Sequence, residues 1–192
     1  MKSIAIMQPT FLPWIGYFGL MDAVDAFVFL DHVAFDKRSW QQRNRIKTPN
    51  GPVWLTVPVE SKGQSGQVIN DVKIKKDHPD FPGKMMKTIA HNYKKTPFYS
   101  EYEDDVFAVF DKGHDYLCDL NIELISYFAA VLGIDTPLLR SSEMDVDGAK
   151  ADLLANICAL EMAGHYVSPP GARDYIDASD AFEKKGIAVE YF

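Results

Sequence analysis

The feature that most constrains the fold is a pair of short apolar runs near the start of the chain, separated by one amphipathic segment. Residues 4–7 stop at Gln8, and residues 26–30 stop at Asp31. Neither run alternates polar with apolar residues, which is typical of parallel strands buried on both faces. Between them, residues 14–24 place large apolar side chains on one broad face, after a proline that suits the start of a helix. The pattern predicts a right-handed β-α-β unit.

The rest of the chain continues the alternation of strand and helix patterns. We predict further strands at residues 53–59, 68–74, 136–139, 166–167 and 187–192, and helices at residues 80–94, 101–110, 114–132 and 148–163. The apolar face of the last of these helices is predicted to hold Leu153, Leu154, Ile157, Cys158 and Met162. Residues 61–66 lack the spacing of a P-loop and predict a mobile hairpin connection, and residues 168–175 predict a polar loop.

These patterns predict one α/β domain over residues 1–192, with a mostly parallel sheet, flanking helices and a helical layer from the middle of the chain. The size and composition, 192 residues with 47% hydrophobic and 24% charged, are those of an ordinary globular protein. We find neither a signal-peptide pattern nor an apolar run near the ~18 residues of a membrane span, and therefore expect a cytoplasmic protein.

Cysteine and histidine usage gives no support for a metal site. Cys118 and Cys158 both fall in amphipathic helical patterns, which suit small buried hydrophobic residues better than a disulfide or a metal ligand. The five histidines are dispersed without a metal-binding spacing. Magnesium carried by a substrate diphosphate needs only one or two carboxylates from the protein, and Asp31 and Asp36 are available for it.

One short segment is strongly basic in a chain whose net charge is -7. Five cations fall within eleven residues, namely Lys37, Arg38, Arg43, Arg45 and Lys47. Two interpretations of this segment are possible, a solvated basic face and a ligand-binding site. The interleaved Trp40, Gln41, Gln42 and Asn44 favour a phosphate, carboxylate or sugar ligand. Nucleic acid is not predicted, because its binders usually carry a broad basic surface.

The functional site is expected where the predicted parallel strands end, because ligands of open parallel sheets bind there. Residues 8–13 and 31–36 should therefore lie side by side at one rim. His32 is the best general base in the chain, and Asp31 forms a catalytic dyad with it if the chain turns between them. The predicted substrate-binding residues are Gln8, Tyr17, Arg38, Arg43, Arg45, Lys47, His91, Tyr93, Ser168 and Tyr175.

Six stretches, taken in their order, resemble the WbqC-like family. They are QPTFLPWIGYF, FVFLDHVAFDKRSWQQRNRIK, WLTVPV, HNYKKTPFY, LLRSSE and HYVSPPGARDYID. The resemblance covers essentially the whole chain, and it implies a bacterial protein associated with O-antigen or capsule gene clusters. Residues 11–18 are also similar to the FxPxHxGH layout of nucleotidylyltransferases, but the spacing is shorter and both histidines are absent, so that chemistry is not carried over.

The leading hypothesis is a transferase of surface-polysaccharide biosynthesis that moves an acyl or aminoacyl group onto an activated sugar. Its small-molecule substrate would be a nucleotide-sugar or an acyl donor, held by the basic segment. One alternative is a non-catalytic nucleotide or sugar-nucleotide binding module that partners another enzyme. Another is a degenerate nucleotidylyltransferase-like enzyme. We predict no covalent intermediate, because no ordered Ser-His-Asp or Cys-His spacing is present.

Overall fold

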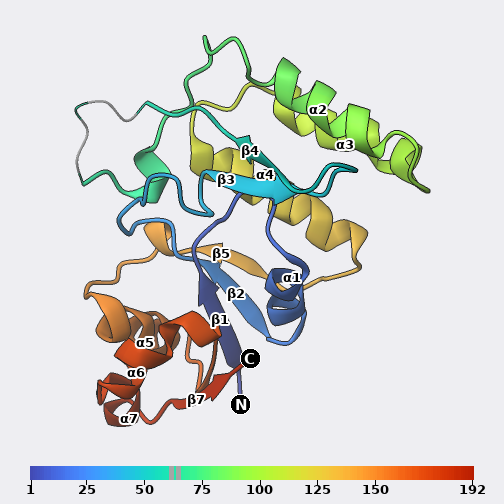
Figure 1. Cartoon of the computed structure of the whole chain (residues 1–192). Coiled ribbons are helices and arrows are strands. Elements are labelled where there is room, and N and C mark those ends of the chain that lie inside the picture. Colours follow the sequence, from blue (N-terminus) through green and yellow to red (C-terminus); the bar gives the residue numbers. More distant parts are fainter. Residues whose placement is uncertain (61–62, 64–65) are drawn as a thin grey trace. The chain divides into compact units, whose positions relative to one another are not determined.

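A computed structural model describes residues 1–60, 63 and 66–192 (Figure 1). The predicted mobile connection at residues 61–66 lies largely outside the described residues. The chain forms two compact units. The sheet unit contains Met1–Gln8, Trp14–His32 and Ala129–Phe192, and the helical unit contains Pro9–Pro13 and Val33–Phe128.

The sheet unit is built on five strands in the order β5-β2-β1-β6-β7, and every pairing between neighbours is parallel. Its elements are β1 (Ser3–Met7), α1 (Ile15–Asp22), β2 (Ala26–Phe29), β5 (Leu138–Arg140), α5 (Lys150–Leu160), β6 (His165–Ser168), α6 (Arg173–Asp177), α7 (Ala181–Lys184) and β7 (Ala188–Tyr191). Short 3-10 turns follow β5 at Ser141–Glu143 and β6 at Pro170–Ala172. The predicted α/β class and the opening β-α-β unit are therefore confirmed.

Burial on both faces explains why the two apolar runs became the centre of this sheet. All four residues of β2 and the three central residues of β1 are buried. Met7 lies opposite Phe29, and Phe29 lies opposite Arg140, so β1, β2 and β5 end at the same level. The Leu30 amide then donates to the Met7 carbonyl at 2.8 Å. The residues that follow these strands must consequently emerge at one edge.

The strand order reverses between β1 and β6. The chain moves from β1 to β2 and β5 on one side, then crosses to β6 and β7 on the other. Right-handed crossovers in opposite directions place their helices on opposite faces of the sheet. Accordingly, α1 lies on one face, and α5, α6 and α7 lie together on the other (Figure 1).

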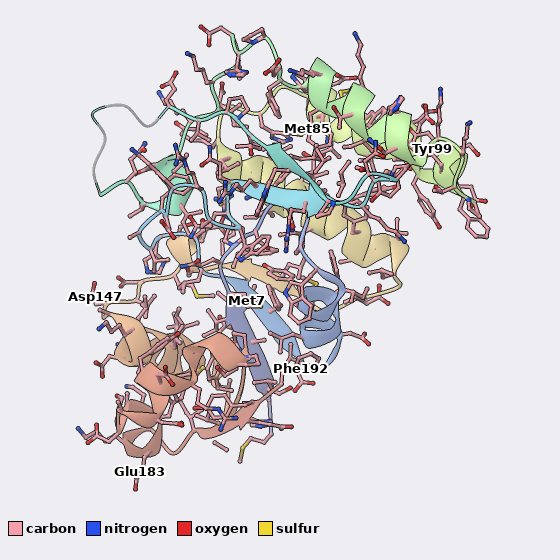
Figure 2. All side chains as sticks on the ribbon, in the orientation of Figure 1. Met7, Met85, Tyr99, Asp147, Glu183 and Phe192 are labelled. Atoms are coloured by element: carbon pink, nitrogen blue, oxygen red, sulfur yellow. The ribbon has the colours of Figure 1, made fainter. Side chains whose placement is uncertain are left out.

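The helical unit contains a two-stranded antiparallel sheet and three helices. These are β3 (Arg43–Ile46), β4 (Val53–Thr56), α2 (Gly83–Tyr93), α3 (Tyr99–Asp111) and α4 (Leu117–Val131), whose residues up to Phe128 belong to this unit. Its core joins Phe11 to apolar residues of the hairpin and helices, including Leu55, Val72, Phe110 and Leu120. Met85 of α2 belongs to this core, and Tyr99 stands at the start of α3 (Figure 2). The predicted helical layer is thus present in the middle of the chain.

Two strand predictions in the middle of the chain were wrong in type or length. Residues 68–74 form a 3-10 turn at Ile69–Asp71 and isolated bridges rather than a strand. Their alternation is real, because Val72 and Ile74 are buried, but the Ile74 amide donates to the Asp115 carbonyl outside any ladder. The strand predicted at residues 53–59 is the shorter β4, and it pairs with β3, which the sequence analysis did not predict.

Smaller corrections concern the second half of the chain. Met162 is 86% exposed, because α5 ends at Leu160 before reaching it. Tyr175 lies in α6 rather than in a polar loop.

Cys118 and Cys158 are buried free thiols, as predicted, and burial raises the pKa of the Cys158 thiol to about 12. No helix in the described part of the chain combines the length and the apolar character needed to cross a membrane.

Candidate functional site

The carboxyl edge of the five-stranded sheet collects polar side chains from four strand ends. Gln8 follows β1, Asp31 and His32 follow β2, Ser141 follows β5, and Ser168 ends β6. All of these residues belong to the sheet unit. The structure therefore brings together Asp31, His32 and Gln8, which the sequence predicted for one rim.

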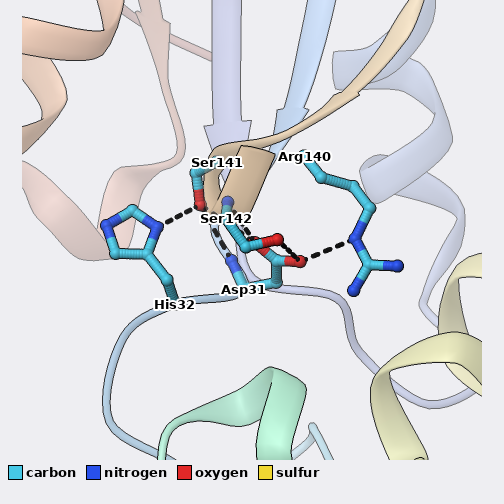
Figure 3. A network of polar contacts seen from close by, with 5 residues as sticks. All are labelled: Asp31, His32, Arg140, Ser141 and Ser142. Carbon is cyan, nitrogen blue, oxygen red and sulfur yellow. Dashed lines mark hydrogen bonds and ion pairs between the residues drawn. The ribbon is translucent and has the colours of Figure 1, made fainter. Parts of the chain in front are cut away.

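Asp31 is the centre of a hydrogen-bond network at this edge (Figure 3). Its side chain is fully buried, and its two oxygens accept four hydrogen bonds from the segment that ends β5. Oδ1 accepts from the Ser142 amide at 2.8 Å and from the Ser141 hydroxyl at 3.1 Å. Oδ2 accepts from Arg140 Nε at 2.8 Å and from the Ser142 hydroxyl at 2.7 Å. The carboxylate thus ties the end of β2 to the end of β5.

This network keeps Asp31 ionised. Burial by itself opposes the charged form, but the Ser142 hydroxyl, the Arg140 guanidinium and the Ser142 amide together outweigh it and hold the pKa of Asp31 below its usual value. A carboxylate with four donors has little capacity left to take a proton from a substrate. Its contribution is to fix the geometry of its neighbours.

The Ser141 hydroxyl connects Asp31 to His32. Ser141 Oγ accepts from the Asp31 backbone amide at 3.1 Å and lies 2.6 Å from His32 Nδ1. A hydroxyl has one proton to donate and two lone pairs to accept with. All three contacts are satisfied when Ser141 donates to the Asp31 carboxylate and His32 Nδ1–H donates to Ser141. This arrangement puts the imidazole proton on Nδ1 and leaves the lone pair on Nε2.

The order of these groups differs from that of a serine nucleophile. In a catalytic triad the histidine lies between the acid and the serine. Here the serine lies between Asp31 and His32, and Ser141 is only 1% exposed. Ser141 therefore orients His32. The imidazole, which is partly exposed, is the group of this network that can exchange a proton with a bound molecule.

Three further predicted residues also belong to the sheet unit. The Tyr17 side chain is buried, and its hydroxyl donates to the Gln8 carbonyl at 3.2 Å, so it holds the backbone at the end of β1. Ser168 is fully buried, and its hydroxyl donates to the Pro169 carbonyl at 3.1 Å. Tyr175 is exposed on α6. Tyr17 and Ser168 thus bind backbone carbonyls at the ends of β1 and β6 and are buried beneath this edge.

The basic segment forms an aromatic and cationic cluster on the hairpin of the helical unit. The Trp40 and Trp54 rings have centroids 5.6 Å apart. The Arg43 guanidinium lies 4.3 Å from the Trp54 centroid, and the Arg45 guanidinium lies 5.3 Å from it. Arg43 and Arg45 share one face of β3 because they are two residues apart. A guanidinium stacked on an indole keeps its N–H donors at the ring edge, available to an anion.

The other predicted cations of this unit are more dispersed. Lys47 and His91 are exposed, and so is Arg38, whose backbone has a left-handed φ of 62°. Tyr93 is partly buried, and its hydroxyl accepts from the Lys47 amide at 3.1 Å, which joins the end of β3 to the end of α2.

The amide side chains of the basic segment serve the fold, which corrects their predicted role as ligand contacts. Gln42 Nε2 donates to the Val57 carbonyl at 2.9 Å, and Asn44 Nδ2 donates to the Leu12 carbonyl at 2.6 Å. Gln41 is buried, and its Oε1 accepts from the Asp36 amide at 3.1 Å. The fully buried Asn121 of α4 donates to the Gln41 and Pro9 carbonyls. These amides satisfy backbone groups of irregular segments that would otherwise be buried unpaired.

Sequence reasoning missed Arg140, Ser141 and Ser142 as site residues. Arg140 ends β5, and Ser141 and Ser142 follow it, so the rule that ligands bind at strand ends applied to them as it did to Asp31 and His32. The signal was weak because this strand has only three residues, Leu138–Arg140.

The predicted site residues fall into two groups, one in each unit. The sheet unit holds Gln8, Tyr17, Asp31, His32, Ser168 and Tyr175, and the helical unit holds Arg38, Arg43, Arg45, Lys47, His91 and Tyr93. Within the described ranges, no group of three or more His, Cys, Asp or Glu side chains is placed to hold a metal ion. Asp36 lies in the helical unit and Asp31 in the sheet unit.

Comparison with known proteins agrees with the resemblance seen in the sequence. The model of the WbqC-like protein family matches residues 8–192, which include nearly all of both units. The chain is 36% identical over 193 residues to "Uncharacterized protein Rv1507c" of Mycobacterium tuberculosis, and the match covers all of this chain and 82% of that relative. No solved structure matches.

Proposed function

Because the chain belongs to the WbqC-like protein family, we propose that it is a cytoplasmic transferase of bacterial surface-polysaccharide biosynthesis, which moves an acyl or aminoacyl group onto an activated sugar. The observation that carries the proposal is the reversal of strand order between β1 and β6. In open parallel sheets, the crevice at such a reversal binds nucleotides and related ligands. Gln8 and Ser168 stand at the two strand ends that flank it, and His32 stands at the next strand end.

The proposed chemistry is a general-base acyl transfer. His32 Nε2 takes the proton from a hydroxyl or amine of the sugar, and the freed oxygen or nitrogen attacks the carbonyl carbon of the acyl donor. The carrier then leaves and takes up the proton from His32. Asp31 and Ser141 act as positioning residues, because they set the imidazole tautomer without needing to touch the substrate.

Within the helical unit, Arg43 and Arg45 are proposed to bind an anionic group, such as a diphosphate or the carrier of an acyl donor. Stacking on Trp40 and Trp54 fixes the guanidinium planes, which favours paired hydrogen bonds to phosphate oxygens. Magnesium, where the substrate brings it, would neutralise the same diphosphate.

A second candidate is a non-catalytic sugar-nucleotide binding module. It is favoured by the state of Asp31, whose four hydrogen bonds leave His32 without a directly bonded carboxylate partner in the described structure. Such a module would use the strand ends of the sheet unit, or the hairpin cations of the helical unit, for affinity alone.

Separate replacement of His32 and Arg43 tests the two candidates. We expect His32→Ala to abolish turnover and to leave nucleotide-sugar affinity within about twofold, because the imidazole takes up a proton in the transition state and contributes little to binding of the substrate. Arg43→Ala should weaken affinity about tenfold or more, because a charge-assisted hydrogen bond is lost. Titration calorimetry against a panel of nucleotide-sugars gives the affinities, and release of the free carrier gives turnover.

Lys87→Ala is the matched control for Arg43→Ala, because it removes an exposed cation from α2 of the same unit. If the wild type binds a nucleotide-sugar and transfers nothing from any acyl or aminoacyl donor, the binding module is the better description. If neither His32→Ala nor Arg43→Ala changes binding or turnover, the assigned site is wrong.

A further inference from the structure

A cavity of about 420 Å³ lies within the helical unit, at the end of β3 and between the ends of α2 and α3. Its walls include Ile46, Ile89, Val106 and Phe107, and its lining is almost entirely apolar. The volume falls in the range of about 300–1,000 Å³ that is typical of small-molecule sites. A site of this size accepts an amino-acid side chain or a short acyl group.

The charge of the lining restricts what can enter. Glu103 is the only ionisable carboxylate among the lining residues, which include no Lys, Arg or His. In the described part of the chain no cation forms a salt bridge with Glu103. A ligand with a free carboxylate would meet a like charge and no counter-charge. A ligand with an ammonium group would supply the missing partner.

A buried hydroxyl of the cavity wall lies near the Glu103 carboxylate. The Tyr99 hydroxyl is buried and, among the described residues, makes no hydrogen bond of normal geometry. Burial, the charge of the nearby Glu103 carboxylate and a hydrogen-bonding interaction with it raise the pKa of Tyr99 and keep the phenol protonated as a donor. Tyr99 and Glu103 are four residues apart on α3 and therefore lie on one face. The phenol is therefore a donor on the cavity wall whose contact with Glu103 falls short of a normal hydrogen bond, and a ligand carbonyl could accept from it with better geometry.

Aromatic rings supply a second preference for a cation. Six lining residues are aromatic, namely Tyr93, Phe98, Tyr99, Tyr102, Phe107 and Phe128. Aromatic faces attract ammonium groups. Phe98 holds a left-handed φ of 66°, which is unusual for a bulky residue and is a strain typical of ligand sites.

We propose that this cavity binds an apolar aminoacyl group, with its side chain among the aromatic residues, its ammonium at Glu103 and its carbonyl oxygen at the Tyr99 hydroxyl. The proposal deepens the proposed function, on which it rests for the role of this group as the one transferred. It selects the aminoacyl donor over the simple acyl donor. Free amino acids are excluded, since their carboxylate has no cation to pair with.

Three probes with the same apolar body and different charges test the selectivity. They are L-leucinamide, N-acetyl-L-leucinamide and 4-methylpentanoate, titrated into the full-length protein by calorimetry. We expect leucinamide to bind at least about tenfold more tightly than either of the other two, because only it pairs with the carboxylate. Methyl NMR shifts of Ile46, Ile89 and Val106 should locate the bound probe in the cavity.

Glu103→Gln keeps the shape of the wall and should remove the preference for leucinamide over its N-acetyl form. Glu101→Gln, on the same helix but outside the cavity lining, is the control and should retain it. Tyr99→Phe should weaken both amides alike. Equal binding of all three probes, or a preference that survives Glu103→Gln, would overturn the proposal, as would no binding of any of them.

The outcome is separable from that of the proposed function. Selective leucinamide binding without transfer to any sugar would refute the transferase and leave the aminoacyl site standing. Transfer of a simple acyl group by a protein that binds no leucinamide would refute the aminoacyl site and leave the transferase standing.

Discussion

The edge of the sheet unit and the hairpin of the helical unit hold their charges in opposite ways. Asp31 is fully buried, and each of its two carboxylate oxygens accepts two hydrogen bonds from the Arg140–Ser142 segment. Arg43 and Arg45 instead lie across partly exposed indole rings, and among the described residues no carboxylate forms a salt bridge with either. Internal pairing fixes a geometry but consumes the charge, whereas stacking fixes a plane and leaves the charge available. The first suits positioning, and the second suits binding.

The largest expected effect comes from breaking the buried side of this contrast. Asp31→Asn should lower the free energy of unfolding by about 3–5 kcal/mol. Arg140 loses its buried counter-charge, and the new side-chain NH2 group points at groups that themselves donate, such as Arg140 Nε or the Ser142 hydroxyl. Urea unfolding at neutral pH measures the loss. Asp22→Asn, an exposed carboxylate of α1 in the same unit, is the control and should change stability by less than about 0.5 kcal/mol. Equal losses in the two variants would contradict the assigned role of Asp31.

The same carboxylate predicts how stability depends on pH. The pKa of Asp31 is lower in the folded protein than in the unfolded chain, so the unfolded chain takes up a proton first as the pH falls. Its stabilising contribution is therefore complete above the unfolded value near 3.8 and is lost as the pH falls through the folded pKa. In urea titrations from pH 6 down to pH 2, Asp31→Asn should show a shallower acid loss than the wild type. If the free energy of unfolding fell with pH in parallel for the wild type and Asp31→Asn, Asp31 would not contribute to the loss of stability in acid.

The exposed side of the contrast predicts a much smaller effect on folding. Arg45→Ala should lower the free energy of unfolding by only about 0.5–1 kcal/mol, the usual size of a partly exposed cation–π contact. Arg45→Lys keeps the charge but not the planar group, so it should retain most of the stability and lose the paired phosphate contacts. Chemical unfolding followed by tryptophan fluorescence reports both. A loss above about 2 kcal/mol would mean that the guanidinium is structural, like Asp31.

The same division explains how much could be predicted from the sequence. Residues 4–7 and 26–30 were predictable as strands because burial on both faces leaves a continuous apolar run. The strand β3 was missed because Arg43 and Arg45 are polar and gain their place from Trp54 across the hairpin, which local periodicity does not register. Asp31 and His32 were predicted from their residue types, but Ser141, which connects them, lies 109 residues after His32 in the chain. Long-range partners of this kind are set by topology rather than by any local pattern.

The smallest expected effect concerns the tautomer of His32. Ser141→Ala removes the acceptor for Nδ1–H and should shift the imidazole toward the form with its proton on Nε2, with a loss of stability of only about 1 kcal/mol. Nitrogen chemical shifts of His32 distinguish the two tautomers directly. Ser142→Ala is the matched control, because Ser142 donates to Asp31 and does not contact His32 through its hydroxyl in the described network. An unchanged tautomer in Ser141→Ala would show that the buried network does not set the proton position. A change in both variants would instead assign the control to the Asp31 carboxylate as a whole, and the proposed general base would then depend on the charge of Asp31 rather than on the Ser141 hydroxyl.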